Sequence, residues 1–303
     1  MKILIGVGTT NLQTLPFLVL RYSLIKNNPD LDLEIVRIDE TQEYVEFQSS
    51  KNHGTVFSMQ RFFTPLIAAK RQADACIYLD SDMLCLKSIN SFIDILKTNP
   101  SNIVIPIPNL RYKQPYQTAV FGCIVNPYIV NKFSKAIEDY TYSLITYKQM
   151  INFNFLQKEI IDCESIYNSR EIYNQNTVIL HFTDLFRQPW VSRFNRNKEI
   201  WISLMQQAAI QNESIKLSIT EGAGKDYLPS LKNILVGNRS GIFIHVKDFT
   251  FSPPQFLVYL RRIKLFDYIL LNKFYFGRVI KILTGICVQL MAFLRDRLNV
   301  RTG

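Results

Sequence analysis

Short apolar runs alternate along the first part of the chain with longer stretches whose apolar residues recur at helical spacing. Each short run is typical of a buried strand. Strands are predicted at residues 2–8, 33–38, 102–107, 119–125 and 177–181, and in the run that ends at Asp80. Helices are predicted at residues 12–26 and 57–70 and directly after Ile89. This alternation predicts an α/β fold in which helices flank a mostly parallel central sheet.

The most informative stretch is the apolar run that leads into two aspartates, Asp80 and Asp82. A buried carboxylate costs several kcal/mol unless something pairs with it, so packing does not explain these residues. In an open α/β sheet, ligands bind at the carboxyl ends of the strands. Two acidic side chains at that edge, with no Lys or Arg in the run, favour a hard divalent cation that bridges a diphosphate.

Two further side chains are predicted to lie near this acidic pair. His181 ends the predicted strand 177–181, and a neutral imidazole can complete a carboxylate site for Mn²⁺. Arg61 lies on the helix before the Asp80 strand, where it can clamp an acidic ligand oxygen or orient Asp80. The other two histidines, His53 and His245, are interpreted as structural or surface residues.

The turn after the first strand is a candidate nucleotide site. It consists of small residues and hydroxyl residues, Gly8, Thr9 and Thr10, followed by a helix. Backbone amides and hydroxyl groups at such a turn can bind a phosphate or a nucleoside. The turn lacks the G-x-G-x-x-G spacing of a dinucleotide fold.

The cysteines and the N-terminus indicate the cellular compartment of the protein, and its charge is concentrated near the C-terminus. Five cysteines without a C-x-x-C pair are typical of reduced packing residues, and the N-terminus lacks the cleavage site of a signal peptide. A cytoplasmic protein is therefore expected. From residue 250 onward, nine basic residues oppose two acidic ones, so this segment carries +7 of the net charge of +10.

The basic segment is also aromatic, which predicts a helical tail over residues 251–303 that follows a core domain of residues 1–250. No apolar stretch in it reaches the roughly 20 residues of a membrane span. Its composition favours an element that lies on an anionic membrane surface, at the inner face of the membrane. The alternative is a helical pair that packs on the core. Nucleic acid is not expected as a partner, because no binding module is present.

Three segments together resemble retaining family 8 of the GT-A glycosyltransferases, which includes lipopolysaccharide galactosyl- and glucosyltransferases and glycogenin. They are SLIKNNP at residues 23–29, FSMQRFFTPLIAAKRQADACIYLDSDMLCLKSI at residues 57–89, and ILHFTDLFRQPW at residues 179–190. The resemblance covers roughly residues 1–205. It implies a GT-A (Rossmann-like) nucleotide-diphospho-sugar transferase fold.

The resemblance also implies roles for individual residues. Mn²⁺ (or Mg²⁺) would be held by Asp80, Asp82 and His181. The nucleotide-sugar donor, a UDP-hexose, would be bound by Gly8, Thr9, Thr10, Arg61, Asp80, Ser81 and Arg187. Gln149 would face the donor sugar and is the catalytic candidate.

Two of the family's motifs are altered in this chain. The family closes with H-x-x-G-x-x-K-P-W, whereas here Asp184 replaces the glycine, Arg187 replaces the lysine and Gln188 is inserted. The family's Asp-Gln pair is matched by Lys148 and Gln149, so the aspartate is missing. The identity of the sugar is therefore not inherited from the resemblance.

The function expected from these features is metal-dependent, retaining transfer of a hexose to a glycan or glycolipid acceptor in cell-surface polysaccharide or lipopolysaccharide synthesis. One alternative is a catalytically impaired GT-A-like protein that binds at a membrane. Another is a sugar-phosphate nucleotidyltransferase. Against the latter, the first-strand turn GVGTTNLQT contains no basic residue.

Overall fold

The computed structural model describes residues 1–49, 56–107, 118–156 and 158–235, together with Asp248, Phe251, Ile286, Gln289, Leu290 and Phe293. These residues form two units. The first contains Met1–Gln13 and Leu20–His181, and the second contains Thr14–Val19 and Phe182–Gly303. Most of the predicted tail lies outside the described residues, so the domain boundary near residue 250 stays a prediction.

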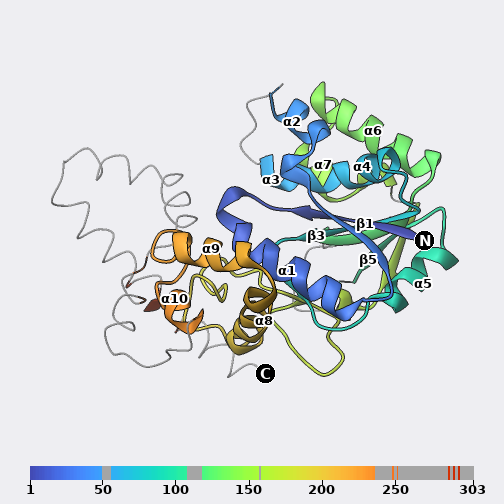
Figure 1. Ribbon diagram of the computed structural model, residues 1–303. Coiled ribbons are helices and arrows are strands. Elements are labelled where there is room, and N and C mark those ends of the chain that lie inside the picture. Colours follow the sequence, from blue (N-terminus) through green and yellow to red (C-terminus); the bar gives the residue numbers. More distant parts are fainter. Residues whose placement is uncertain are drawn as a thin grey trace, which may run out of the picture. The chain divides into compact units, whose positions relative to one another are not determined.

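A six-stranded sheet forms the centre of the first unit (Figure 1). Its order is β2 (Asp32–Arg37), β1 (Lys2–Gly8), β3 (Ala75–Asp80), β6 (Val120–Ile124), β5 (Ile103–Pro106) and β7 (Ile160–Cys163). Only β6 runs antiparallel to its neighbours in this sheet. The prediction of a mostly parallel sheet is therefore confirmed. The register pairs Gly8 with Asp80, so the turn after β1 begins beside the first aspartate.

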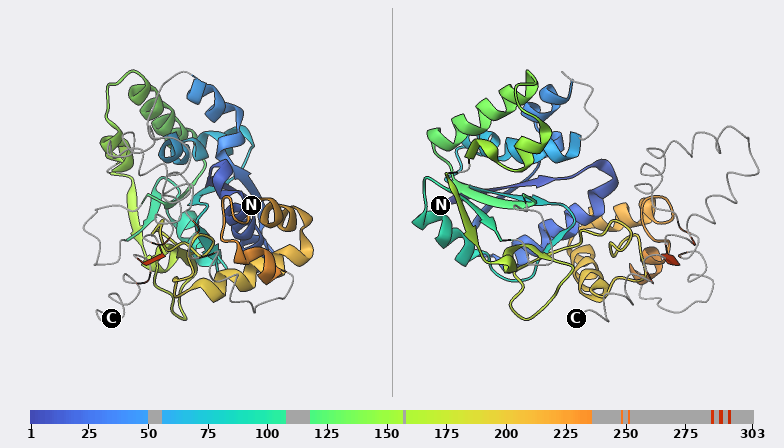
Figure 2. Two further views of the ribbon diagram at one scale, coloured as in Figure 1. Left: turned by 90° about the vertical axis from the view of Figure 1, so that its left-hand side faces the viewer. Right: turned by 180° about the vertical axis from the view of Figure 1, so that it is seen from behind.

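Helices cover both faces of this sheet, as Figures 1 and 2 show. One face carries α2 (Gln42–Ser49), α3 (Val56–Met59), α4 (Thr64–Lys70), α6 (Pro127–Thr141) and α7 (Tyr147–Ile151). The other carries α5 (Asn90–Thr98) and the Leu20–Asn27 part of α1 (Thr14–Asn27). Short 3-10 helices lie between these elements: η1 (Asn11–Gln13), η2 (Ile38–Glu40), η3 (Gln60–Phe63), η4 (Asn154–Leu156) and η5 (Ser165–Asn168).

The helix predicted at residues 57–70 is interrupted in the structure. The 3-10 turn η3 separates α3 from α4, and Pro65 stands in the first turn of α4. Proline lacks an amide hydrogen and is favoured at such a helix start, which explains why α4 begins there. The interruption places Gln60 and Arg61 on η3 instead of within a continuous helix.

The predicted strand at residues 177–181 is present but belongs to a different sheet. It is β9 (Ile179–His181), which lies between β4 (Met83–Cys85) and β8 (Ser169–Arg170) in a three-stranded sheet. Strands β4 and β9 are antiparallel, and Met83 pairs with His181. This pairing brings the histidine next to the residue that follows Asp82.

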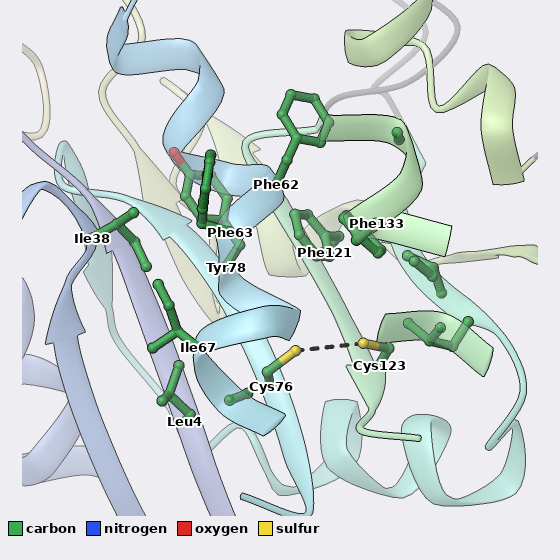
Figure 3. Packing of buried hydrophobic residues seen from close by; sticks show 14 of the residues in the cluster. Leu4, Ile38, Phe62, Phe63, Ile67, Cys76, Tyr78, Phe121, Cys123 and Phe133 are labelled. Atoms are coloured by element: carbon green, nitrogen blue, oxygen red, sulfur yellow. Dashed lines mark hydrogen bonds between the residues drawn. The ribbon is translucent and has the colours of Figure 1, made fainter. Parts of the chain in front are cut away.

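An aromatic cluster fills the core on the α4 and α6 side of the sheet (Figure 3). The ring of Phe121 stacks on those of Tyr78 and Phe133, with centroid distances of 5.7 Å and 5.8 Å. The sulfur atoms of Cys76 and Cys123 approach to 3.4 Å across β3 and β6. The four described cysteines are free and buried, which confirms their predicted packing role.

In the described part of the second unit, three helices pack on one another: α8 (Lys198–Gln211), α9 (Glu213–Gly222) and α10 (Ser230–Leu235). Trp190 and Trp201 are fully buried in this unit, with ring centroids 5.4 Å apart. Among the described residues, no helix combines the length and the hydropathy that a membrane crossing requires.

Candidate metal and donor site

Asp80, Asp82 and His181 come together in the first unit. Asp80 ends β3, Asp82 lies in the turn between β3 and β4, and His181 ends β9. One ligand atom from each residue lies within 4.8 Å of the others. The predicted proximity of these three side chains is therefore observed. Two carboxylates and an imidazole form a donor set that fits Mn²⁺, so the residues present are suited to the predicted ion.

The imidazole of His181 lies between an amide and a carboxylate. Its Nε2 atom is 3.1 Å from Asp82 Oδ1, and its Nδ1 atom is 2.8 Å from Asn168 Oδ1. His181 and Asn168 are buried, whereas the side chain of Asp82 keeps 13% of its exposure. The side chain of Asp80 keeps 12%, so both carboxylates retain some accessible surface, whereas His181 retains less.

Asp80 is held by two neighbours from β3 and η3. The Tyr78 hydroxyl donates to Asp80 Oδ1 at 2.5 Å, and Arg61 Nη2 lies 3.8 Å from the same oxygen. Burial raises the pKa of the Asp80 carboxyl, the Arg61 guanidinium opposes this shift, and the charge of Asp82 adds to it. A divalent cation between the carboxylates would supply the charge that keeps both ionised.

Arg61 acts on Asp80 from a mostly buried position. Its Nη1 donates to the hydroxyl of Thr118, and its Cζ atom lies 5.4 Å from the centroid of the Tyr78 ring. The Arg61 side chain keeps only 11% of its exposure. Of the two roles predicted for it, the contacts support the orientation of Asp80, while contact with the donor stays a prediction.

The predicted nucleoside turn is tied to the rest of the first unit. Gln60 bonds to Thr9 twice, since its Oε1 accepts from the Thr9 amide and its Nε2 donates to the Thr9 carbonyl, each at 2.8 Å. The Ser81 amide donates to the Gly8 carbonyl at 2.9 Å, and the Ser81 hydroxyl donates to Gln13 at 3.0 Å. These bonds hold the turn firmly beside Asp80.

The residues predicted to contact the donor differ in how accessible their side chains are. Thr9 and Ser81 are fully buried and have internal partners, whereas Thr10 is partly exposed. Donor binding by Gly8, Thr9 and Ser81 stays a prediction, and Thr10 is the residue of the turn that offers an accessible side chain.

Gln149 and Arg187 lie outside the contacts described so far. Gln149 is exposed in the first turn of α7, where its Oε1 accepts from the amide of Thr146 at 2.7 Å as part of a capping box. Arg187 belongs to the second unit and is 1% exposed. The predicted roles of Gln149 at the sugar and of Arg187 at the phosphate stay predictions.

Sequence reasoning missed four residues that contact the site: Asn168, Tyr78, Gln60 and Thr118. Tyr78 could have been found, because a residue two positions before Asp80 on the same strand points to the same face. Gln60 could have been noticed as the neighbour of Arg61. The sequence carries no local signal for Asn168 or Thr118, which are brought in by the packing of distant segments.

Comparison with known proteins shows which fold this architecture represents. No family model and no curated protein sequence matches the chain. The solved structure of the glycosyltransferase GlyE from Streptococcus pneumoniae matches with a TM-score of 0.51 and 15% identity, over 73% of this chain and 64% of that one. The bifunctional glycosyltransferase WbbM matches with a TM-score of 0.52 and 12% identity, over 67% of this chain and 49% of that one. The fold is that of the GT-A glycosyltransferases.

A third similar structure is the galactosyltransferase LgtC in complex with donor and acceptor sugar analogs. It has a TM-score of 0.48 and 12% identity, over 69% of this chain and 96% of that one. The likeness to GlyE and WbbM establishes the fold alone, and the activity has to be argued from the residues of the site.

Proposed function

We propose that this protein is a metal-dependent glycosyltransferase that moves a hexose from a UDP-sugar to a glycan or glycolipid acceptor. The observation that carries the proposal is the cluster of Asp80, Asp82 and His181 beside the end of β3 in a GT-A fold. Ligands of open α/β sheets bind at this edge. The sequence resemblance to family 8 supports retention of the anomeric configuration.

The side chains of this cluster would hold Mn²⁺ or Mg²⁺ together with the donor diphosphate. When bound, the cation would supply Lewis-acid stabilisation of the charge that develops on the leaving nucleoside diphosphate. Tyr78 and Arg61 hold Asp80 in one orientation, so the site needs little rearrangement to bind. Burial of Asp80 and His181 limits access of water to this side of the site.

The roles proposed for Gln149 and Arg187 rest on the sequence resemblance to family 8. Gln149 is the nearest candidate for a group that faces the donor sugar, and its amide is a poor nucleophile. Departure of the diphosphate and attack of the acceptor on the same face therefore fit better than a double displacement. Arg187 would neutralise phosphate charge, as the family lysine does.

The acceptor and the location follow from the tail. Nine basic and many aromatic residues after residue 250 would hold the protein on the inner face of an anionic membrane. The active site would then lie close to a lipid-linked or lipopolysaccharide glycan.

The test is a panel of nucleotide sugars screened for Mn²⁺-dependent hydrolysis and transfer. We expect Asp82→Asn and Asp80→Asn to lower turnover at least about 100-fold, because a metal contributes several kcal/mol and each 1.36 kcal/mol is a factor of ten. Asp94→Asn, which alters an aspartate 69% exposed on α5, is the matched control and should retain activity. Full turnover of the Asp82 variant would refute the assignment.

The same screen separates the alternatives. Consumption of a nucleoside triphosphate with release of pyrophosphate would identify a nucleotidyltransferase. Calorimetric binding of UDP and Mn²⁺ without turnover of any sugar would identify a binding protein.

A further inference from the structure

The contact between Asn168 and His181 bears on the protonation of the imidazole. Asn168 presents its side-chain oxygen to His181 Nδ1 at 2.8 Å. An amide oxygen carries no proton, so the hydrogen bond requires Nδ1 to carry one. In a neutral imidazole, a proton on Nδ1 leaves a lone pair on Nε2.

That lone pair faces an oxygen that is also only an acceptor. Nε2 lies 3.1 Å from Asp82 Oδ1, and an ionised carboxylate has no proton to share. Two lone pairs at this separation repel each other in a buried site, where electrostatic interactions are strong. A cation held by His181 and Asp82 would replace this repulsion with attraction.

The fold holds Asn168 in place for this contact. It is the last residue of η5 and directly precedes β8, which pairs with β9 so that Ser169 lies opposite Leu180. The amide of Glu171 donates to the His181 carbonyl at 2.9 Å, which ties the backbone of the histidine to the same segment. Asn168 is 3% exposed, so water does not compete for its oxygen.

We propose that Asn168 is a positioning residue that keeps the proton of His181 on Nδ1 and so presents Nε2 as a ready ligand for the divalent cation. This inference rests on the metal site of the proposed function. Ligating histidines commonly donate their second ring N–H to a neighbouring oxygen, and removal of that partner typically weakens metal binding about 10–100-fold.

The tautomer is measured directly in the metal-free full-length protein. The chain contains three histidines, so ¹⁵N-histidine labelling gives few signals, and a His181→Gln variant identifies those of His181. We expect Nδ1 of His181 to carry a proton in the wild type, because Asn168 Oδ1 can only accept. A ring that carries its proton on Nε2 and none on Nδ1 would overturn the proposal.

Metal affinity gives the second readout. We expect Asn168→Leu, which keeps the branching at Cγ but has no acceptor, to weaken Mn²⁺ binding about 10–100-fold by titration with electron paramagnetic resonance. Asn168→Asp keeps an oxygen at this position and should bind Mn²⁺ within about threefold of the wild type. Asn28→Leu is the control for loss of a buried asparagine, since Asn28 is 4% exposed and bonds to Leu24 and Ile89.

The outcomes separate this inference from the proposed function. Wild-type affinity in a folded Asn168→Leu variant would overturn the inference, and so would an equal loss in Asn28→Leu. If the Leu variant does not fold, the wild-type tautomer and the affinity of Asn168→Asp still decide. A protein with the expected tautomer and Mn²⁺ affinities that transfers no sugar would refute the proposed function and leave the role of Asn168 intact.

Discussion

At the scale of single residues, the hydrogen bond from Tyr78 to Asp80 explains why a glycine ends β1. A Cβ atom at position 8 would lie 2.0 Å from the Tyr78 hydroxyl oxygen, far inside van der Waals contact. The hydroxyl cannot move away easily, because it donates to Asp80 at 2.5 Å and its ring is stacked on Phe121. The end of β1 and the orientation of the first aspartate are therefore coupled through one side chain.

This coupling predicts non-additive stability effects. Gly8→Ala should destabilise the protein in urea unfolding, because the methyl group displaces the Tyr78 hydroxyl. Tyr78→Phe should cost about 1.5–3 kcal/mol, since it removes a hydrogen bond to a charged group. In the double variant the clash with the hydroxyl is gone, so the two losses should fall short of their sum by about 0.5–3 kcal/mol. Additive losses would show that the two residues are independent.

At the scale of elements, the break between α3 and α4 has a function in the fold. The 3-10 turn η3 carries Gln60 toward the turn after β1, where its amide pairs with both backbone groups of Thr9. Thr9 is fully buried, so without this amide its N–H and C=O would lack partners and water. One side chain thus fixes the segment that leads from β1 toward the predicted donor site.

We predict that Gln60→Leu destabilises the first unit strongly. Each buried backbone group left unpaired costs about 1–3 kcal/mol, which gives about 2–6 kcal/mol for the two groups of Thr9. Gln42→Leu is the control, because Gln42 is exposed and bonds only within α2 to Glu46 in the hydrogen bonds described, so its loss should stay within about 0.5 kcal/mol. Equal urea midpoints for the two variants would contradict the prediction.

At the scale of the whole molecule, the uneven charge distinguishes the tail from the rest. Residues from 250 onward carry +7, which leaves +3 for the preceding 249 residues. Two described tail residues pack within the second unit. Gln289 donates to the Val191 carbonyl at 3.0 Å, and the ring centroids of Phe293 and Phe194 lie 5.3 Å apart. Part of the tail thus contributes to this unit, so a deletion of the tail would disturb folding as well as charge.

Neutralisation of charge is therefore the sharper test of membrane binding. Replacement of Arg261, Arg262 and Lys264 by glutamine should weaken binding to anionic vesicles, by roughly 1 kcal/mol for each charge that lies near the surface. The control removes three exposed lysines of the first unit, Lys70, Lys97 and Lys135, with the same change in net charge. Equal vesicle cosedimentation of the two variants would show that the tail has no special role.

Much of the central sheet could be predicted from local patterns. The runs at residues 2–8, 33–38, 102–107 and 119–125 were each found within one or two residues of the observed strand ends. Buried strands in a covered parallel sheet are apolar on both faces, so the signal lies within each segment. The break in the helix at residues 57–70 was missed, although Pro65 is visible in the sequence, because apolar spacing continues through η3.

The sequence by itself determined most strands of the central sheet, though not β7, and that Asp80 and Asp82 would stand at the end of one of them. Burial patterns and the cost of a buried carboxylate are local properties. Only the tertiary structure decided that β9 pairs with β4, that the Tyr78 hydroxyl fills the space beside Gly8, and that Asn168 contacts His181. These contacts join segments whose mutual approach depends on how the whole unit packs, and hydrophobic periodicity carries no information about which segments will meet.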